Sequence, residues 1–166
     1  MPGLRPTPDR VRETLFNWLG QDLSGWRCID AFAGTGALGL EAASRGASGV
    51  RLVEQDSALV AQLARLQARL QAAAVRVERA DGVSALKRLG AASMDLVLLD
   101  PPFDSTLLAQ ALPEAVRILA PQGFVYLEAP RRWLDEELAA LGLVLYRYLK
   151  AGAVHAHLLQ RVNPVA

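Results

Sequence analysis

Two kinds of hydrophobic pattern alternate along the chain: short, nearly continuous apolar runs and longer stretches in which apolar residues recur every three or four positions. The runs are typical of buried strands, and the stretches are typical of helices that bury one face. A helix is also expected before the first strand, with Thr7 as its N-cap and Pro8 in its first position. The expected strands span residues 27–32, 50–53, 75–78, 94–99, 124–128, 143–149 and 155–161. The expected helix stripes are Val11, Leu15, Trp18 and Leu19; Leu59, Leu63, Leu66 and Leu70; Leu108, Leu112, Val116 and Leu119; and Leu134, Leu138 and Leu141.

The alternation of strands and helices predicts one α/β domain with a doubly wound, Rossmann-like sheet of seven strands. Residues 121–123, Pro-Gln-Gly, are expected to turn the chain into the fifth strand. The last two strands are joined by a segment around Gly152 that is too short for a crossover helix, so they are expected to form an antiparallel hairpin. The predicted sheet is therefore mostly parallel, with a reversed closing hairpin strand.

A glycine-rich loop, residues 33–39, joins the first strand to the helix that follows it. Gly34 and Gly36 permit backbone conformations and close approaches that other residues forbid, and Gly39 would let the helix lie tight against the sheet. The second strand ends at Glu54, whose carboxylate is placed to accept hydrogen bonds from a ribose diol. Together these features predict a cofactor that contains a nucleoside.

The fourth strand runs into the tetrad Asp100-Pro101-Pro102-Phe103, at the end of the sheet where open α/β folds bind their ligands. Two successive prolines remove backbone donors and stiffen the turn, so carbonyl oxygens lie beside the Asp100 carboxylate. Acceptors without competing donors suit an amine, and Phe103 offers a flat face for a planar ring. The tetrad therefore predicts a site for an aromatic amine. The structural alternative is a proline stop after the strand, with Asp100 as a helix cap.

Composition narrows the class of protein. The chain of 166 residues is long enough for one domain, and although 52% of it is apolar, no uninterrupted apolar stretch approaches the ~18–20 residues of a membrane span. The single cysteine, Cys28, falls in the first strand, so no intramolecular disulfide is possible and the thiol is expected to stay protonated in the core. We therefore expect a soluble cytoplasmic protein with no membrane partner. His155 and His157 alternate along the last strand and are interpreted as packing or surface residues rather than metal ligands.

The distribution of charge is more informative than the net charge of +1, which neither favours nor excludes nucleic acid as a partner. Arg5, Arg10 and Arg12 cluster near the amino terminus, and Arg131 and Arg132 follow the fifth strand. Such clusters usually form solvated faces. We expect phosphate contacts chiefly from the first cluster and less from the second.

Three segments carry a resemblance to a known family. Residues 4–19, which begin Leu-Arg-Pro-Thr-Pro, residues 30–42, which begin Asp-Ala-Phe-Ala-Gly-Thr-Gly, and the tetrad 100–103 closely resemble the bacterial 16S ribosomal RNA guanine-N2 methyltransferases. Five βα units closed by a reversed hairpin are also the outline of the class I S-adenosylmethionine-dependent methyltransferases. The likeness spans nearly the whole chain.

The resemblance implies methyl transfer from S-adenosylmethionine, with S-adenosylhomocysteine as product, to the exocyclic N2 amine of a guanine in small-subunit ribosomal RNA. The RNA would be met either naked or within an assembling or complete small ribosomal subunit. The resemblance surrounds the methionine part of the cofactor with Asp30, Gly34 and Gly36. It places Glu54 at the ribose and Asp81 at the adenine amine. The other cofactor residues that it implies are Phe32, Thr35 and Gly82.

On the substrate side, the resemblance implies that Asp100 and the Pro101 carbonyl each accept one N–H of the target amine, which turns the nitrogen lone pair toward the methyl group. Phe103 would stack on the flipped base, and no metal is needed. Residues 1–19 are expected to form a flap and a first helix at the entrance of the site. The residues expected to meet the RNA are Pro102, Arg5, Thr7, Arg10 and Arg12.

Several alternatives stay open from the sequence. Asp30 could cap the following turn, Glu54 could cap its helix, and Asp81 could shape a turn with Gly82. Adenine-N6 methyltransferases use very similar tetrads, so the tetrad alone does not separate guanine from adenine or from another nucleic-acid amine. A nicotinamide-dependent oxidoreductase would fit the glycine loop and a non-catalytic RNA-binding module would fit the arginines, but neither gives the tetrad a role. Members of the family usually begin with a basic, glycine-containing hairpin, whereas this sequence starts at Met1-Pro2-Gly3, so we expect weak binding to naked RNA.

Overall fold

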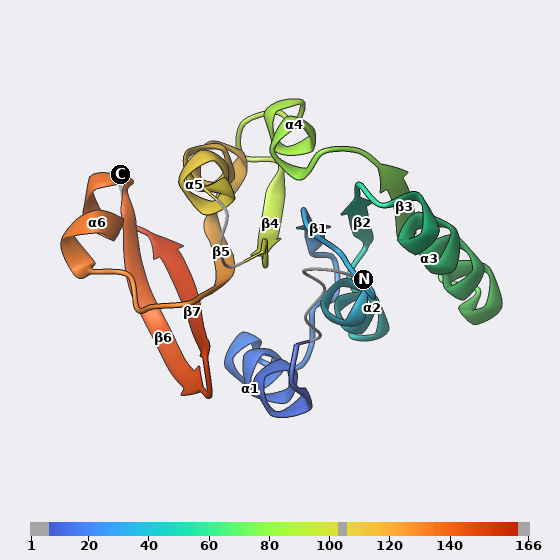
Figure 1. Cartoon of the computed structure of the whole chain (residues 1–166), viewed down its shortest axis with the longest axis horizontal. Helices are drawn as coiled ribbons and strands as arrows, with labels where there is room; N and C mark the ends of the chain where they lie inside the picture. The colour runs from blue at the N-terminus through green and yellow to red at the C-terminus, as the bar shows by residue number, and fades with distance from the viewer. Residues whose placement is uncertain (1–6, 103–105, 163–166) are drawn as a thin grey trace.

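A mixed sheet of seven strands forms the centre of the protein, in the order β3-β2-β1-β4-β5-β7-β6 (Figure 1). The computed structural model describes residues 7–102 and 106–162. Strands β1 to β5 pair in parallel, and β7 pairs antiparallel with both β5 and β6, which confirms the predicted sheet and its reversed hairpin. The strands are β1 (Arg27–Asp30), β2 (Gly49–Glu54), β3 (Val75–Arg79), β4 (Met94–Leu99), β5 (Leu119–Ala129), β6 (Leu143–Ala151) and β7 (Val154–Arg161).

Helices cover both faces of the sheet, and Figure 1 shows α4 and α5 on one side with α1 and α2 on the other. Strand β4 divides its side chains between the two faces, because Val97 and Leu99 belong to one buried cluster and Leu96 and Leu98 to the other. A strand segment that is buried on both faces has to be apolar, and this explains why residues 96–99 of β4 stand out in the sequence. The helices are α1 (Asp9–Leu19), α2 (Ala37–Ser44), α3 (Ser57–Leu70), α4 (Gly82–Lys87), α5 (Leu107–Ile118) and α6 (Asp135–Ala140).

The structure confirms the predicted stripe of α5 and extends it. Leu112 and Leu119 are fully buried, and Leu108 and Val116 are half-buried against the same core. Ala111 and Ala115 are also fully buried, and their small side chains let the helix backbone approach the sheet closely. In α3 the predicted stripe stops short, since Leu70 at the end of the helix is 58% exposed.

Two other local predictions were wrong. Thr7 is not the N-cap of α1: the helix begins at Asp9, Pro8 occupies the cap position, and no side chain caps it. The short helix α4 after β3 was not predicted, because six residues are too few to display a helical period.

The expected turn before β5 is instead a bulge within one long strand. Along β4 the paired residue advances from Met94 to Leu96, while along β5 it advances from Leu119 to Phe124. A Cβ atom on Gly123 would lie 2.9 Å from the Asp95 carbonyl oxygen, so only glycine fits this bulge without displacing the neighbouring strand.

Glycine at position 39 allows α2 to lie against β2, as the sequence predicts. A Cβ atom at this position would lie 2.2 Å from Leu52 Cδ2 and 3.3 Å from Val50 Cγ1. Both of those side chains are buried in the sheet. The close contact fixes the distance between the glycine-rich loop and the second strand.

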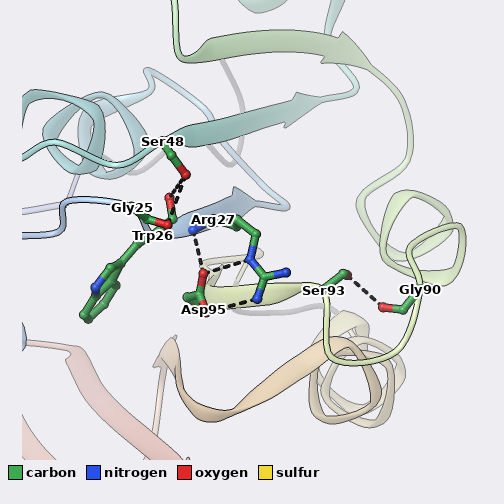
Figure 2. A network of polar contacts seen from close by, with 7 residues as sticks. All are labelled: Gly25, Trp26, Arg27, Ser48, Gly90, Ser93 and Asp95. Atoms are coloured by element: carbon green, nitrogen blue, oxygen red, sulfur yellow. Dashed lines mark hydrogen bonds and ion pairs between the residues drawn. The ribbon is translucent and has the colours of Figure 1, made fainter.

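A polar network ties β1 to β4 at their amino ends (Figure 2). The Asp95 carboxylate accepts hydrogen bonds from the Arg27 backbone N–H at 2.8 Å, from its Nε at 3.0 Å and from its Nη2 at 3.2 Å. Ser48 and Ser93 donate to nearby carbonyls in the same region (Figure 2). The strand order reverses between β1 and β4. The network therefore fixes the position of these two strands relative to each other, and their carboxyl ends lie at the opposite edge of the sheet.

We expect Asp95→Asn to destabilise the fold by about 0.5–1 kcal/mol at neutral pH, the size of a partly exposed ion pair. The Arg27 side chain, by hydrogen bonding, is the main cause that lowers the pKa of Asp95 below its ordinary value. A carboxylate with a lowered folded-state pKa stabilises the fold above its unfolded pKa and loses that contribution as the pH falls through the folded value.

The difference between the wild type and Asp95→Asn should therefore shrink between about pH 6 and about pH 2. Urea denaturation at a series of pH values measures it. Glu13→Gln, at an exposed position on α1, serves as the control and should show little difference at any pH. A loss in Asp95→Asn that does not depend on pH would contradict the assignment to this ion pair.

Candidate active site

A cleft of about 290 Å³ lies at the carboxyl ends of β1, β2, β3 and β4. The strand order reverses between β1 and β4, and this is where open parallel sheets leave a crevice for ligands. Acidic residues end or follow each of the four strands there: Asp30, Glu54, Asp81 and Asp100. The sequence predicted that all four would share this edge, and the structure brings them together. The other predicted residues that line the cleft are Thr7, Phe32, Gly34, Thr35, Gly82, Pro101 and Pro102.

Asp30 is a buried carboxylate at the end of β1, only 2% exposed. Burial raises its pKa to about 7, backbone hydrogen bonds from Phe32 and Gly39 oppose the shift, and the nearby charges of Glu128 and Glu54 reinforce it. Its Oδ1 atom has no hydrogen-bond partner within residues 7–102 and 106–162. A buried acceptor oxygen that lines a cleft and has no partner among these residues is suited to bind a hydrogen-bond donor of a ligand.

Glu54 organises the glycine-rich loop. Its Oε1 accepts the Gly34 backbone N–H at 2.9 Å, and its Oε2 accepts the Asp56 backbone N–H at 2.8 Å. Asp56, not Glu54, caps α3 by accepting from the backbone of Ala58 and Leu59, which settles one alternative left open by the sequence. Glu54 thus holds the loop against the end of β2 while it lines the cleft.

Gly36 has a structural role in the glycine-rich loop. It has a φ of +83° before α2, and a Cβ atom there would lie 2.6 Å from Leu63 Cδ2. Gly36 therefore lets the loop turn and pack against α3. Gly34 and Thr35 line the cleft, and a contact of Gly36 with the cofactor stays a prediction.

Asp81 and Gly82 form the wall below β3. Asp81 caps α4 through Oδ2, which accepts the Ser84 backbone N–H at 2.9 Å and its hydroxyl at 2.8 Å. Both contacts fall on one oxygen. Asp81 thus caps a helix, where the sequence suggested at most a turn shaped with Gly82, and it also lines the cleft. A Cβ atom on Gly82 would lie 2.4 Å from the Ala31 carbonyl oxygen and 2.8 Å from the Phe32 ring.

Asp100, Pro101 and Pro102 form the turn at the end of β4. All three line the cleft, Pro101 is buried, and Pro102 is exposed at its rim. Phe103, which was expected to stack on the base, lies outside the described residues, and so does Arg5. The turn places a carboxylate and a stiff, proline-bounded backbone directly beside the residues of the glycine-rich loop.

Glu128, at the end of β5, is a functional candidate that the sequence reasoning missed. It is fully buried, and its Oε2 accepts the Tyr126 hydroxyl at 2.7 Å and the Thr7 hydroxyl at 3.2 Å. The signal was present, because Glu128 ends its predicted strand just as Asp30 and Glu54 end theirs. The bond from the Thr7 hydroxyl fixes the segment before α1 at the cleft. Thr7 therefore anchors this segment and does not cap the helix.

Arg10 and Arg12, from the cluster near the amino terminus, differ in their contacts. Arg10 is exposed on α1, but Arg12 pairs with Asp9 at 3.2 Å and approaches Glu41 of α2 at 3.6 Å. Neither lines the cleft. Arg12 therefore links two helices, and of these two described arginines Arg10 presents the exposed charge expected for a phosphate contact.

The buried residues outside the site agree with their sequence interpretation. Burial raises the pKa of the Cys28 thiol to about 12, so it stays protonated. His157 is buried and bonded to the backbone. Within the described residues, no cluster of three or more His, Cys, Asp or Glu side chains is arranged to hold a metal ion. In the same part of the chain, the helices are too short or too polar to cross a lipid bilayer.

The chain is similar to proteins of one family along nearly its whole length. Residues 1–160 match the family model described as Conserved hypothetical protein 95. The chain is 42% identical over 157 residues to Ribosomal RNA small subunit methyltransferase D of Escherichia coli strain K12, which covers 88% of this chain and 79% of that protein. It is 36% identical over 158 residues to the protein of the same name in Haemophilus influenzae, covering 87% of this chain and 82% of that one.

Solved structures give the same result. The putative methyltransferase yhhF from Escherichia coli has a TM-score of 0.83 and 40% identity, with 96% of this chain and 89% of that chain covered. A putative RNA methyltransferase from Pyrococcus horikoshii, 22% identical with a TM-score of 0.77 over 98% of this chain and 89% of that chain, shares the fold. The chain therefore belongs to the Conserved hypothetical protein 95 family, a family of class I methyltransferases that includes ribosomal RNA small subunit methyltransferase D.

Proposed function

We propose that residues 1–166 act as a single methyltransferase domain, which transfers a methyl group from S-adenosylmethionine to the exocyclic N2 amine of a guanine in small-subunit ribosomal RNA. The observation that carries the proposal is the junction of an acidic, glycine-lined cleft with the turn Asp100-Pro101-Pro102. The names of the relatives support ribosomal RNA as the substrate. Family membership favours methyl transfer over hydride transfer or a purely structural RNA-binding role.

The residues of the cleft fit S-adenosylmethionine. Asp30 offers a buried acceptor to its positively charged methionine end, and Glu54 lies at the end of β2, where a ribose diol is recognised in folds of this kind. Gly82 lines the β3 side of the cleft, and because it has no Cβ atom it can pack against the Ala31 carbonyl oxygen and the Phe32 ring. When bound, the cofactor supplies an electrophilic methyl group.

Asp100 and Pro101 prepare the amine. An exocyclic guanine nitrogen is a poor nucleophile because its lone pair is delocalised into the ring. Two acceptors, the Asp100 carboxylate and the Pro101 carbonyl, would each take one N–H and turn the lone pair toward the methyl group. The positive charge that develops on nitrogen then meets a carboxylate and a carbonyl dipole, and Asp100 can take the departing proton.

The substrate itself is tested by methyl transfer from labelled S-adenosylmethionine to small subunits that lack the modification, to naked 16S RNA and to DNA. Nucleoside analysis of the product should give N2-methylguanosine, with small subunits better than naked RNA. If the product were N6-methyladenosine, the target base would be adenine and not guanine. Label in DNA alone, or in no nucleic acid, would overturn the proposal.

Asp100→Ala should reduce kcat by at least about a hundredfold, the usual size of a lost acid–base or charge-stabilising group, and leave the Kd for S-adenosylhomocysteine nearly unchanged. Asp100→Asn should keep more activity than Asp100→Ala, because its amide oxygen still accepts a hydrogen bond. Single-turnover kinetics and calorimetry separate the two quantities. Near-native turnover in Asp100→Ala would show that the amine is prepared elsewhere.

Cofactor affinity should depend on pH through Asp30. Its raised pKa, about 7, reflects burial together with the charges of Glu128 and Glu54, so it ionises as the pH rises through neutrality. A sulfonium cation favours the ionised form, whereas the neutral sulfur of S-adenosylhomocysteine does not. Affinity for S-adenosylmethionine relative to S-adenosylhomocysteine should therefore rise by up to about tenfold between roughly pH 6 and pH 8, the factor that corresponds to one pKa unit.

Calorimetric titrations with both compounds across this range measure the ratio. Asp30→Asn should flatten it, because the side chain no longer titrates. A ratio that rises equally in the wild type and in Asp30→Asn would assign the effect to another group.

A further inference from the structure

We propose that a second groove, beside the cofactor cleft, receives the target nucleotide, and that Trp133 and Arg131 form its outer wall. This inference rests on the proposed function, since it assigns the substrate side of the same site. The groove has a volume of about 680 Å³ and lies between the end of β4 and the segment that joins β5 to α6.

The groove and the cofactor cleft adjoin each other at the end of β4. Pro101 and Pro102 line both, so this proline segment lies between them. An occupant of the second groove therefore lies against the same residues that are proposed to hold the amine. Apolar side chains such as Leu108 and Leu141 line part of the groove, which suits the faces of a base that has left its stack.

The outer wall consists of two planar groups. The Arg131 guanidinium carbon lies 5.0 Å from the centre of the Trp133 ring. Arg131 also makes a bidentate ion pair with Glu137, with both N–O distances at 2.9 Å. This pairing partly neutralises its charge and fixes its plane, so Arg131 is better suited to stacking than to contact with a phosphate.

The backbone of Trp133 is anchored to the core. Its N–H donates to Nε2 of His157 at 3.0 Å, while Nδ1 of His157 donates to the His155 carbonyl at 3.0 Å. Burial is the main cause that lowers the pKa of His157 to about 4, so the ring is neutral and Nε2 can accept at physiological pH. The wall is therefore positioned before any ligand arrives, which reduces the entropic cost of binding.

These features favour a nucleotide over other occupants. An aromatic ring beside a fixed guanidinium gives two flat surfaces, which bases use for stacking in single-stranded nucleic-acid sites. Because the groove adjoins the Asp100 turn, it leads such a base to the acceptors at the end of β4. The cofactor cleft already supplies the glycine loop and acidic strand ends, so the second groove is not needed for the cofactor.

The kinetic test compares Trp133→Ala and Trp133→Phe on unmodified small subunits. Loss of one stacking contact should lower kcat/KM for the RNA substrate by about 5- to 150-fold in Trp133→Ala, and Trp133→Phe should retain most of it. Arg131→Lys, which keeps the charge but loses the plane, should resemble Arg131→Ala. The Kd for S-adenosylhomocysteine should stay unchanged in all of these variants.

Tyr146→Ala is the matched control. Like Trp133, Tyr146 has an arginine over its ring, with the Arg147 guanidinium carbon 4.1 Å from the ring centre, but it lies on β6 and lines neither the cleft nor the groove. The kcat/KM of Tyr146→Ala for the RNA substrate should equal that of the wild type. An equal loss in Tyr146→Ala and Trp133→Ala would mean that any aromatic surface contributes, and it would overturn the assignment of the groove.

A binding test does not depend on catalysis. The sequence has three tryptophans, so Trp18→Phe with Trp26→Phe leaves Trp133 as the only strong emitter. With S-adenosylhomocysteine bound, guanosine 5′-monophosphate should quench this emission saturably, while ribose 5-phosphate should not. A variant with Trp18→Phe and Trp133→Phe, in which only Trp26 emits, should show no saturable quenching.

The outcomes distinguish the two proposals. Full RNA activity in Trp133→Ala, or no saturable quenching at Trp133, would overturn the groove while leaving the methyltransferase function intact. A wild type inactive on every nucleic acid would overturn the proposed function, and saturable quenching by guanosine 5′-monophosphate would then still support a nucleotide groove. Quenching of Trp133 by S-adenosylhomocysteine alone would assign the groove to the cofactor and overturn the proposal.

Discussion

The burial of carboxylates at the carboxyl ends of neighbouring strands is the constraint on which the site depends. Asp30 and Glu128 are both buried, and a buried charge is tolerated only where donors compensate for the lost water. For Asp30 the donors are backbone N–H groups after β1 and in α2, and for Glu128 they include the hydroxyls of Tyr126 and Thr7. These bonds fix the glycine loop and the segment before α1, so the electrostatic compensation also builds the walls of the cleft.

Much of the fold could be predicted because the central strands are buried on both faces, and their buried positions form short apolar runs such as residues 96–99 of β4. The acidic strand ends could be predicted to meet because parallel strands end at one edge of a sheet. Contacts between elements that lie far apart in the sequence could not be predicted from these patterns. The ion pair of Arg12 with Glu41, the bond of Thr7 to Glu128 and the alanine face of α5 depend on how helices settle against the sheet.

The second groove was hidden from the sequence for the same reason. Its lining combines Pro101 and Pro102 of the tetrad with residues of α5, the end of β5, the β5–α6 connection and α6, and outside the tetrad these segments carry no motif. His157 illustrates the difficulty: its position in a strand correctly indicated packing, but its bond to the Trp133 backbone depends on the β5–β7 pairing. Pro101 and Pro102 line both the cofactor cleft and the second groove, so this stiff segment lies between the two.

The placement of carboxylates on both sides of that segment bears on the proposed reaction itself. In the proposed reaction, methyl transfer moves a positive charge from sulfur to nitrogen, so a carboxylate at the methionine end of the cofactor alone, such as Asp30, would stabilise the reactants more than the transition state and would oppose the step. Asp100 follows the adjacent strand and lines the same cleft, and the proposed mechanism places the reacting nitrogen beside it. In that mechanism the moving charge would meet a carboxylate at each end of its path, and only the Asp100 contribution would grow as the reaction proceeds. The product has lost the sulfonium charge, so Asp30 would hold it less tightly than it holds the methylated cofactor.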